Sequence, residues 1–247
     1  MENIPINLPL GLVQVRNVAI PQIKPSCGPI FFAESLEIAA GNVKDSGSFG
    51  LINTGKKKLL VTCHHVVEGF RDLKSKQPKL MLCLALGITP EVLNLDALID
   101  EDKELDLAVF DMAGMMQIPR ERVFFPFDCK QKCNVAKENV LLVIGYPGRH
   151  RVEFDKAIYW GTTPHLSIAS DVTERNIYSS TQRMVNLNRQ RLSGIYENPY
   201  GGVSGSLCFV LQKDFRPQLV GVVSKHAMET MTITRLQCLR SDGMLKK

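Results

Sequence analysis

The stretch Leu59-Leu-Val-Thr-Cys-His-His-Val-Val67 joins an apolar run to two adjacent histidines. Its β-branched and apolar residues predict a buried strand that ends at Thr62. A histidine at the end of such a strand is held by rigid backbone at the edge of the core, which is where a general base has to be held. Taken alone, the pattern fits at least as well a core histidine whose ring is hydrogen-bonded to a backbone carbonyl.

Two further segments carry groups of matching chemistry. Asp106 opens an apolar run at 107–110, and a carboxylate there is costly to desolvate unless a donor such as a histidine ring nitrogen binds it. Ser204 lies in Tyr200-Gly-Gly-Val-Ser-Gly-Ser206, whose glycines allow a tight turn with outward-facing amides, as an activated serine requires. Each segment alone also fits a structural role, as a solvated aspartate at a strand end or a glycine-rich hairpin turn. Their order along the chain, with His65 first, makes the combination informative.

Short strand-like runs recur along the chain, whereas helical periodicity is scarce. The predicted strands are residues 50–53, 58–62, 79–86, 91–98, 106–111, 140–144, 151–159, 206–211 and 218–224. One short helical turn is predicted at residues 64–70. Many strands of similar length joined by turns are typical of a β-barrel or sandwich, so the sequence predicts an all-β fold.

The composition is that of an ordinary soluble domain. The 247 residues include 30 Lys+Arg and 25 Asp+Glu, a net charge of +5, and 45% of them are hydrophobic. The basic residues are scattered and lack interleaved aromatic side chains, which argues against a nucleic-acid-binding protein. No apolar run approaches the roughly 18–20 residues of a membrane span. The N-terminus is broken by Pro5 and Pro9 and lacks the basic start of a secretory signal.

The seven cysteines are an odd number and lie mostly in apolar stretches, which favours reduced thiols. Cys129 and Cys133 form the one close pair in the sequence. That pair has no second pair and no neighbouring histidine, so a zinc site is disfavoured. We therefore expect a cytoplasmic protein that uses no metal and no cofactor.

Proline-rich and charged stretches divide the chain. We expect an N-terminal surface arm at residues 1–30 and a first β-barrel at residues 31–113. An inter-barrel linker at residues 114–134 would lead to a second β-barrel at residues 135–230, and a C-terminal tail would follow at residues 231–247. Long loops that shape a surface site are expected within residues 171–201.

The motifs resemble those of the trypsin/chymotrypsin-like serine peptidases, most closely their Deg/HtrA-type bacterial branch, over residues 45–227. Thr62-Cys-His-His-Val66 resembles the family motif Thr-x-x-His-Val, and Asp106-Leu-Ala-Val109 resembles Asp-Leu-Ala-Val. Ile144-Gly-Tyr-Pro-Gly148 is similar to a Gly-x-Pro turn of the family, and Gly202-Val-Ser-Gly-Ser206 is similar to Gly-x-Ser-Gly-Gly. The resemblance implies two packed six-stranded antiparallel β-barrels with few short helices. It also implies a site in the cleft between the barrels.

The activity implied by the resemblance is that of a serine endopeptidase acting on a protein or peptide substrate. His65 would be the base, Asp106 its orienting carboxylate and Ser204 the nucleophile. The backbone amides of Gly202 and Ser204 would bind the oxyanion.

The same alignment places four residues around the primary specificity pocket. Asn198 would lie at its base, Lys225 and His226 along its wall, and Ser224 where a family serine supports the triad carboxylate. A basic wall would favour an acidic or polar side chain before the cut bond. The alternative is that Lys225 points to solvent and His226 only narrows the pocket.

The chain departs from the family pattern in ways that change the expectations. Val203 precedes the nucleophile in place of an aspartate, and no Ile-Val-Gly-Gly-like N-terminus is present, so we expect no zymogen activation by N-terminal insertion. Ser206 replaces a glycine, and its side chain is expected to crowd the oxyanion turn. We expect no peptide-binding PDZ domain after the barrels.

Alternatives to an active protease remain open. A catalytically silent barrel pair would act as a protein-binding module, although silent relatives usually lose a triad residue. A nucleic-acid or membrane-surface protein is disfavoured by the scattered charges. Cys63 and Cys208 lie outside the glycine-flanked turn, so neither is expected to be the nucleophile. For an active protease we expect control by a regulatory protein partner or by the site loops at 171–201.

Overall fold

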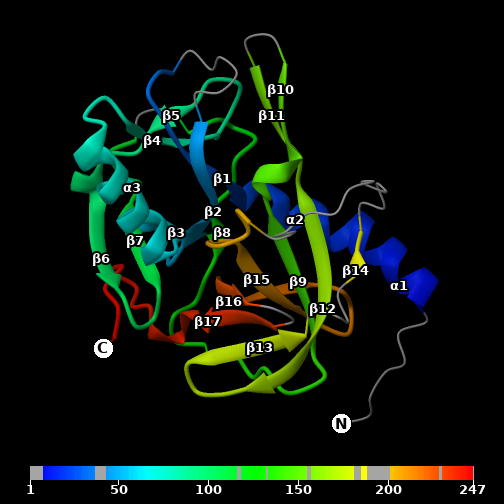
Figure 1. The fold of residues 1–247 in the computed structure, drawn as a ribbon. Helices are drawn as coiled ribbons and strands as arrows, with labels where there is room; N and C mark the ends of the chain where they lie inside the picture. Colours follow the sequence, from blue (N-terminus) through cyan, green and yellow to red (C-terminus); the bar gives the residue numbers. More distant parts are fainter. Residues whose placement is uncertain are drawn as a thin grey trace.

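The computed structural model describes residues 8–36, 43–115, 118–131, 133–154, 157–180, 185–187, 201–227 and 230–246. Strands predominate among these residues, and they form two β units that lie side by side (Figure 1). None of the described helices is long and apolar enough to cross a membrane.

The N-terminal unit is a sheet with the strand order β5-β4-β1-β2-β3-β7-β6. Its members are β1 (Cys27–Ala33), β2 (Val43–Asn53), β3 (Lys58–Thr62), β4 (Met81–Leu84), β5 (Glu91–Val92), β6 (Leu98–Asp102), β7 (Leu107–Asp111) and the short β8 (Phe125–Pro126), which pairs with β2. Among the described strands, β5 and β6 at the two edges do not pair, so this sheet is open.

The C-terminal unit is a closed barrel of six strands. Its members are β9 (Val140–Gly145), β12 (Thr163–Val172), β13 (Asn176–Ser180), β15 (Leu207–Leu211), β16 (Pro217–Ala227) and β17 (Thr230–Arg235). They follow the order β13-β17-β16-β15-β9-β12, and a β12–β13 pairing closes the ring. The short β14 (Val185–Asn186) extends the sheet beside β12, and β10 (Arg151–Phe154) and β11 (Ala157–Trp160) form a hairpin that projects from the molecule (Figure 1).

The prediction of a mostly β fold with few helices is confirmed, and one closed six-stranded barrel is present. The prediction of two closed six-stranded barrels is not confirmed, because the N-terminal unit is open in the described residues. A short edge strand explains the opening. Strand β5 spans only two residues, between Pro90, which has no amide hydrogen to donate, and Leu93 and Asn94, which lie outside any strand.

Helical turns run from Leu8 to Ser26 and include α1 (Leu8–Gln14) and α2 (Ile20–Ile23). Val15, Ala19 and Ile23 recur every fourth residue, which places them on one face, and all three are buried in the main core. The segment expected to form a surface arm therefore contributes side chains to the core.

Helix α3 (His64–Lys76) directly follows β3 and is longer than the single turn expected from the sequence. Val66, Val67 and Phe70 are buried on its inner face. The helix ends just before Pro78, which disfavours helical geometry at the residue preceding it. Because β3 is a central strand, the first turn of α3 starts from rigid backbone.

A single large hydrophobic cluster includes side chains from both β units, such as Leu51 and Leu60 of the sheet and Leu142 and Phe209 of the barrel. One close approach between the units lies at Gly50, where a Cβ atom would be 2.2 Å from the side chain of Leu207. Since β2 and β15 meet at this contact, residues that adjoin these strands are held in fixed relative positions.

Candidate active site

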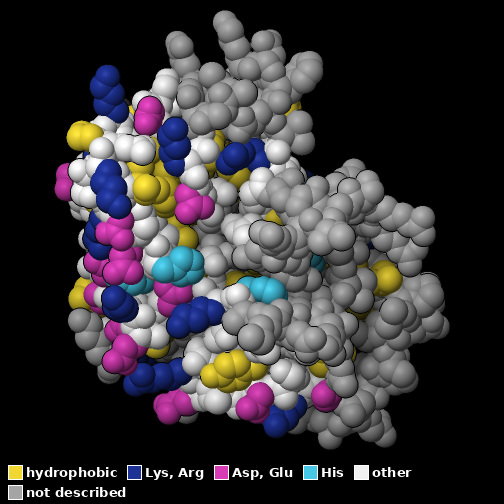
Figure 2. Space-filling model, viewed as in Figure 1, with side chains coloured by type: hydrophobic (Ala, Val, Ile, Leu, Met, Phe, Trp, Pro, Cys, Tyr) yellow, Lys and Arg dark blue, Asp and Glu magenta, His cyan; other side chains and the backbone are white. Residues whose placement is uncertain are grey.

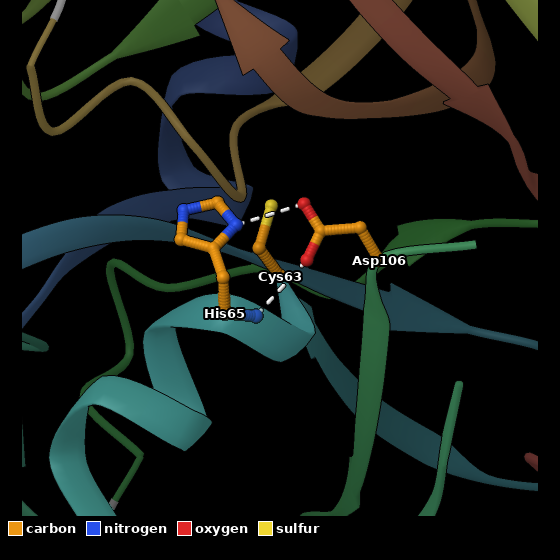
Figure 3. A group of neighbouring side chains, drawn as sticks. All are labelled: Cys63, His65 and Asp106. Carbon is orange, nitrogen blue, oxygen red and sulfur yellow. Dashed lines mark hydrogen bonds and ion pairs between the residues drawn. The ribbon is translucent and has the colours of Figure 1, made fainter. Parts of the chain in front are cut away.

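His65 and Asp106 are brought together by the pairing of β3 with β7. Thr62, the last residue of β3, pairs with Ala108, so the helix start after β3 and the turn before β7 lie side by side. Nδ1 of His65 lies 2.8 Å from Oδ2 of Asp106, and the backbone amide of His65 donates to Oδ1 at 2.9 Å (Figure 3). An ionised carboxylate only accepts hydrogen bonds, so Nδ1 carries the proton and Nε2 is left to accept. Figure 3 shows Nε2 turned away from the carboxylate.

The two members of this pair differ sharply in exposure. The Asp106 side chain is 7% exposed, whereas the His65 side chain is 47% exposed. A buried carboxylate needs donors, and the two bonds from His65 supply them. Asp106 also has φ of +52°, a left-handed conformation that aspartate tolerates better than most residues. The backbone is thus strained at the residue that orients the imidazole.

Only one of the two adjacent histidines faces Asp106. Nδ1 of His64 lies 3.2 Å from Oε2 of Glu101, and Glu101 also accepts two bonds from Arg71 at 2.8 and 2.9 Å. His64 is therefore part of a hydrogen-bonded network with Glu101 and Arg71, and His65 is the candidate base.

Ser204 lies in residues 201–206, which we call the serine turn. Gly202 and Gly205 both have φ of +92°, in the region that favours glycine. A Cβ atom on Gly205 would lie 1.9 Å from the carbonyl oxygen of Ser48 and 2.6 Å from Oγ1 of Thr62. The serine turn is therefore packed closely against β2 and the end of β3, and the glycines at 202 and 205 allow that approach.

Four successive carbonyl groups of the serine turn accept hydrogen bonds from the rest of the protein or from the turn itself. The donors are Gly148 N to Gly201 O (3.0 Å), Ser48 Oγ to Gly202 O (2.7 Å), Ser206 N to Val203 O (3.0 Å) and Ser48 N to Ser204 O (2.7 Å). Within the described residues, the amides of Gly202 and Ser204 donate to no acceptor. Since N–H and C=O point in opposite directions in a trans peptide, fixing the carbonyls of Gly201 and Val203 aims these two amides away from the scaffold.

The serine turn and His65 are linked through short chains of contacts. Oγ1 of Thr62, three residues before His65, donates to Ser48 O at 2.8 Å, and the amide of Ser48 in turn binds Ser204 O. In Figure 3 the gold loop of the serine turn descends beside the imidazole. In the described part of the chain, however, no hydrogen bond joins Oγ of Ser204 to His65.

Cys63 lies beneath this pair, and the ligand atoms of Cys63, His65 and Asp106 are all within 4.8 Å of one another (Figure 3). The Cys63 thiol is buried and donates to Val223 O at 3.1 Å. Burial, reinforced by the negative charge of Asp106, raises the pKa of this thiol well above its usual value. Metal ligation needs a thiolate, so this donor set fits a protonated thiol beside a hydrogen-bonded His–Asp pair better than a metal site.

The residues expected around the specificity pocket are described in part. Asn198 lies outside the described residues. The Ser224 hydroxyl donates to Thr232 O at 3.2 Å, and among the described residues no hydrogen bond joins it to Asp106. Lys225 is exposed, and His226 is half-buried. Partial burial lowers the pKa of His226 and favours its neutral form.

The Ser206 side chain does not crowd the amides of the serine turn. It is fully buried, and a Cβ atom built on Gly145 of β9 would lie 3.1 Å from its Oγ. Ser206 thus points into the barrel, where Gly145 leaves space for it.

The surface around the site carries both signs of charge. In Figure 2, Lys and Arg side chains are mixed with Asp and Glu over the described part of the visible face.

No protein-family model matches the chain, and no curated protein matches its sequence. Many solved structures are similar to it in fold, including the following two. A thermostable serine protease, AL20, from an extremophilic microorganism is 11% identical, with a TM-score of 0.46 and coverage of 85% of this chain and 91% of that chain. The structure of Deg5 is 14% identical, with a TM-score of 0.49 and coverage of 89% of both chains.

Proposed function

We propose that this protein is a serine endopeptidase that cleaves peptide bonds through Ser204, His65 and Asp106. The observation that carries the proposal is the geometry of two elements at the seam between the β units. One is an imidazole held through both oxygens of a buried carboxylate, and the other is the serine turn, in which the amides of Gly202 and Ser204 donate to no acceptor among the described residues. Such elements are what a general base and an oxyanion site require, and they support Ser204 as the nucleophile of the proposal.

The reaction begins with Nε2 of His65, which accepts the hydroxyl proton of Ser204 while Oγ attacks the scissile carbonyl carbon. Asp106 keeps the other ring proton on Nδ1 and stabilises the imidazolium that forms. The amides of Gly202 and Ser204 donate to the oxyanion of the tetrahedral intermediate. His65 then returns the proton to the leaving amine, which departs and leaves an acyl group on Ser204.

The second half of the reaction regenerates the enzyme. His65 takes a proton from a water molecule that attacks the acyl carbon, and the proton passes to Ser204 as the product acid leaves. The absence of a hydrogen bond between Ser204 and His65 in the described structure is compatible with these reaction steps, because catalytic hydrogen bonds often tighten only when substrate binds.

The substrate is a protein or peptide, and the motifs favour an enzyme of the Deg/HtrA type that works in the cytoplasm. An asparagine at position 198 supplies no carboxylate for a basic side chain. The pocket then favours a polar or acidic side chain before the cut bond, with Lys225 as the charged donor, since His226 is held in its neutral form. A regulatory protein partner or the loops at 171–201 would restrain the activity.

One observation favours a second candidate function. Since Ser204 and His65 are not hydrogen-bonded in the described structure, a catalytically silent barrel pair that binds other proteins would have the same geometry.

Labelling with a fluorophosphonate separates the two candidates. If the site is active, the fluorophosphonate phosphonylates Ser204, and the Ser204→Ala variant is not labelled. The matched control is Ser75→Ala, which removes an exposed hydroxyl from the helix that carries His65. Folded wild-type protein that takes up no label at Ser204 would support the binding module instead.

A further inference from the structure

Ser48 is a buried strand residue whose polar atoms are all hydrogen-bonded. It lies in β2, and its side chain is fully shielded from solvent. Its hydroxyl donates to Gly202 O at 2.7 Å and accepts from the amide of Tyr146 at 3.2 Å. Its amide donates to Ser204 O at 2.7 Å, and its carbonyl accepts from Thr62 Oγ1 at 2.8 Å. One residue thus connects the serine turn, the strand before His65 and the loop after β9.

The peptide between Gly202 and Val203 depends on this hydroxyl. The carbonyls of Gly201, Val203 and Ser204 accept from backbone amides, whereas the carbonyl of Gly202 accepts from a side chain. Gly202 has access to a wide range of backbone angles, so its own conformation does not prevent this peptide from rotating. The Ser48 hydroxyl is then the group that selects one orientation.

The orientation of that central peptide determines where its neighbours point. The amide of Gly202 lies on one side of it and the amide of Ser204 on the other, and both remain unbonded within the described structure. A rotation of the Gly202–Val203 peptide would strain the bonds that hold the peptides on either side, which carry these two amides, and would move Ser204 relative to His65. Oxyanion donors act only when they are fixed in advance at the right distance.

We propose that Ser48 is a positioning residue that locks the serine turn in its oxyanion-binding orientation. The proposal rests on the proposed protease function, because it assigns a purpose to the direction of the two amides. Ser48 does not touch the reacting atoms. It acts through the Gly202 carbonyl, and through Thr62 it keeps the serine turn in register with the strand that leads to His65.

The test compares Ser48→Ala with wild type on a peptide substrate. We expect kcat to fall at least about tenfold with KM within about twofold, because the turn contributes to the transition state rather than to ground-state binding. Fluorophosphonate labelling of Ser204 should slow by a similar factor. The NMR signal of the proton between His65 and Asp106 should stay unchanged, since neither residue is hydrogen-bonded to the Ser48 side chain.

The matched control is Thr54→Val. The Thr54 hydroxyl also donates to a carbonyl of a distant segment, Ser241 O at 2.7 Å, and accepts an amide, Lys57 N at 3.0 Å, but it lies away from the serine turn. We expect kcat within about twofold of wild type in this variant. An equal loss of kcat in both variants would show a general effect of hydroxyl removal and would overturn the proposal.

Amide hydrogen exchange tests whether Ser48 fixes the serine turn, and this measurement does not depend on catalytic activity. The amides of Gly205 and Ser206 are bonded to Val223 O and Val203 O at 2.8 and 3.0 Å. In Ser48→Ala they should exchange at least about tenfold faster, with no change in Thr54→Val. Unchanged exchange, or full kcat in a folded Ser48→Ala protein, would overturn the proposal. Wild-type protein without any turnover or label would refute the protease function, while the exchange result would still decide whether Ser48 locks the turn.

Discussion

Asp106 binds His65 through both carboxylate oxygens, one to the ring nitrogen Nδ1 at 2.8 Å and one to the backbone amide at 2.9 Å. The carboxylate thereby fixes the rotation of the ring and the position of the helix start together. Because the aspartate is buried and the histidine is half-exposed, the free face of the ring is turned to where a substrate could reach it.

Asp106→Asn should lower kcat/KM by about 10⁴-fold. The new amide group donates to Nδ1, so the ring proton moves to Nε2 and the base can no longer accept from Ser204. Steady-state kinetics on a peptide substrate measure the loss. The matched control is Glu101→Gln, which changes the carboxylate that binds His64, and its activity should remain within about twofold of wild type. Comparable losses in both variants would contradict the assignment of His65 as the base.

Gly50→Ala should destabilise the protein by about 1–3 kcal/mol, because its Cβ would lie 2.2 Å from the Leu207 side chain at the contact between the two β units. Gly69→Ala is the matched control. It lies in α3 with no atom within 4 Å of its Cβ position, and alanine there should stabilise by about 0.5–1 kcal/mol. Denaturant unfolding measures both values. A neutral Gly50→Ala would mean that the units are not tightly packed at this point.

The buried thiols should resist alkylation in the folded protein. Burial raises the pKa of Cys63 well above its usual value, and it raises the pKa of Cys27 to about 12. Cys129, Cys133 and Cys238 are only partly buried and should react with iodoacetamide before the buried thiols at pH 8. Mass spectrometry of native and unfolded protein gives the order of labelling. Native labelling of Cys63 as fast as that of Cys129 would contradict the protonated state assigned to Cys63.

The ion pair between Lys57 and Asp111 makes stability depend on pH. The hydrogen bond from Lys57 lowers the pKa of Asp111 below 3.8, so the pair stabilises the fold at neutral pH and this contribution is lost as pH falls through the folded-state pKa. Lys57→Met should lower the free energy of unfolding at pH 7 by at most about 1 kcal/mol, because both side chains are partly exposed. The difference from wild type should shrink towards zero in acid.

Urea unfolding at several pH values measures this effect, and Lys56→Met, at an exposed neighbouring lysine, is the control. A difference between Lys57→Met and wild type that stays the same from neutral to acid pH would contradict the role of Asp111.

Local sequence signals predicted the elements that carry the candidate base. Strand β3 has the predicted bounds, because its β-branched run is bounded by charged residues on one side and the histidines on the other. Strand β1 was missed, since Gly28 and Pro29 look like loop residues although the whole strand is buried between neighbours. Strand β12 was missed because Pro164, His165 and several serines conceal its alternation.

The long-range features of the site could not be read from the sequence in the same way. Ser48 looks like any small residue in a strand, and its importance comes from Gly202, which is brought to it only by the packing of the two units. The pairing of β16 with β17 brings the Ser224 hydroxyl to Thr232 O. A motif specifies which residue types meet, but the partner of each hydroxyl depends on which carbonyl the fold leaves within reach.

The burial of Val15, Ala19 and Ile23 affects how the protein could be processed or engineered. A cut that removed these residues would leave an apolar hollow open to water, and the shortened chain would tend to aggregate. Limited digestion should therefore spare the helical segment from Val15 to Ile23 for as long as the remainder stays folded, and expression variants designed without it should be recovered mainly as insoluble material.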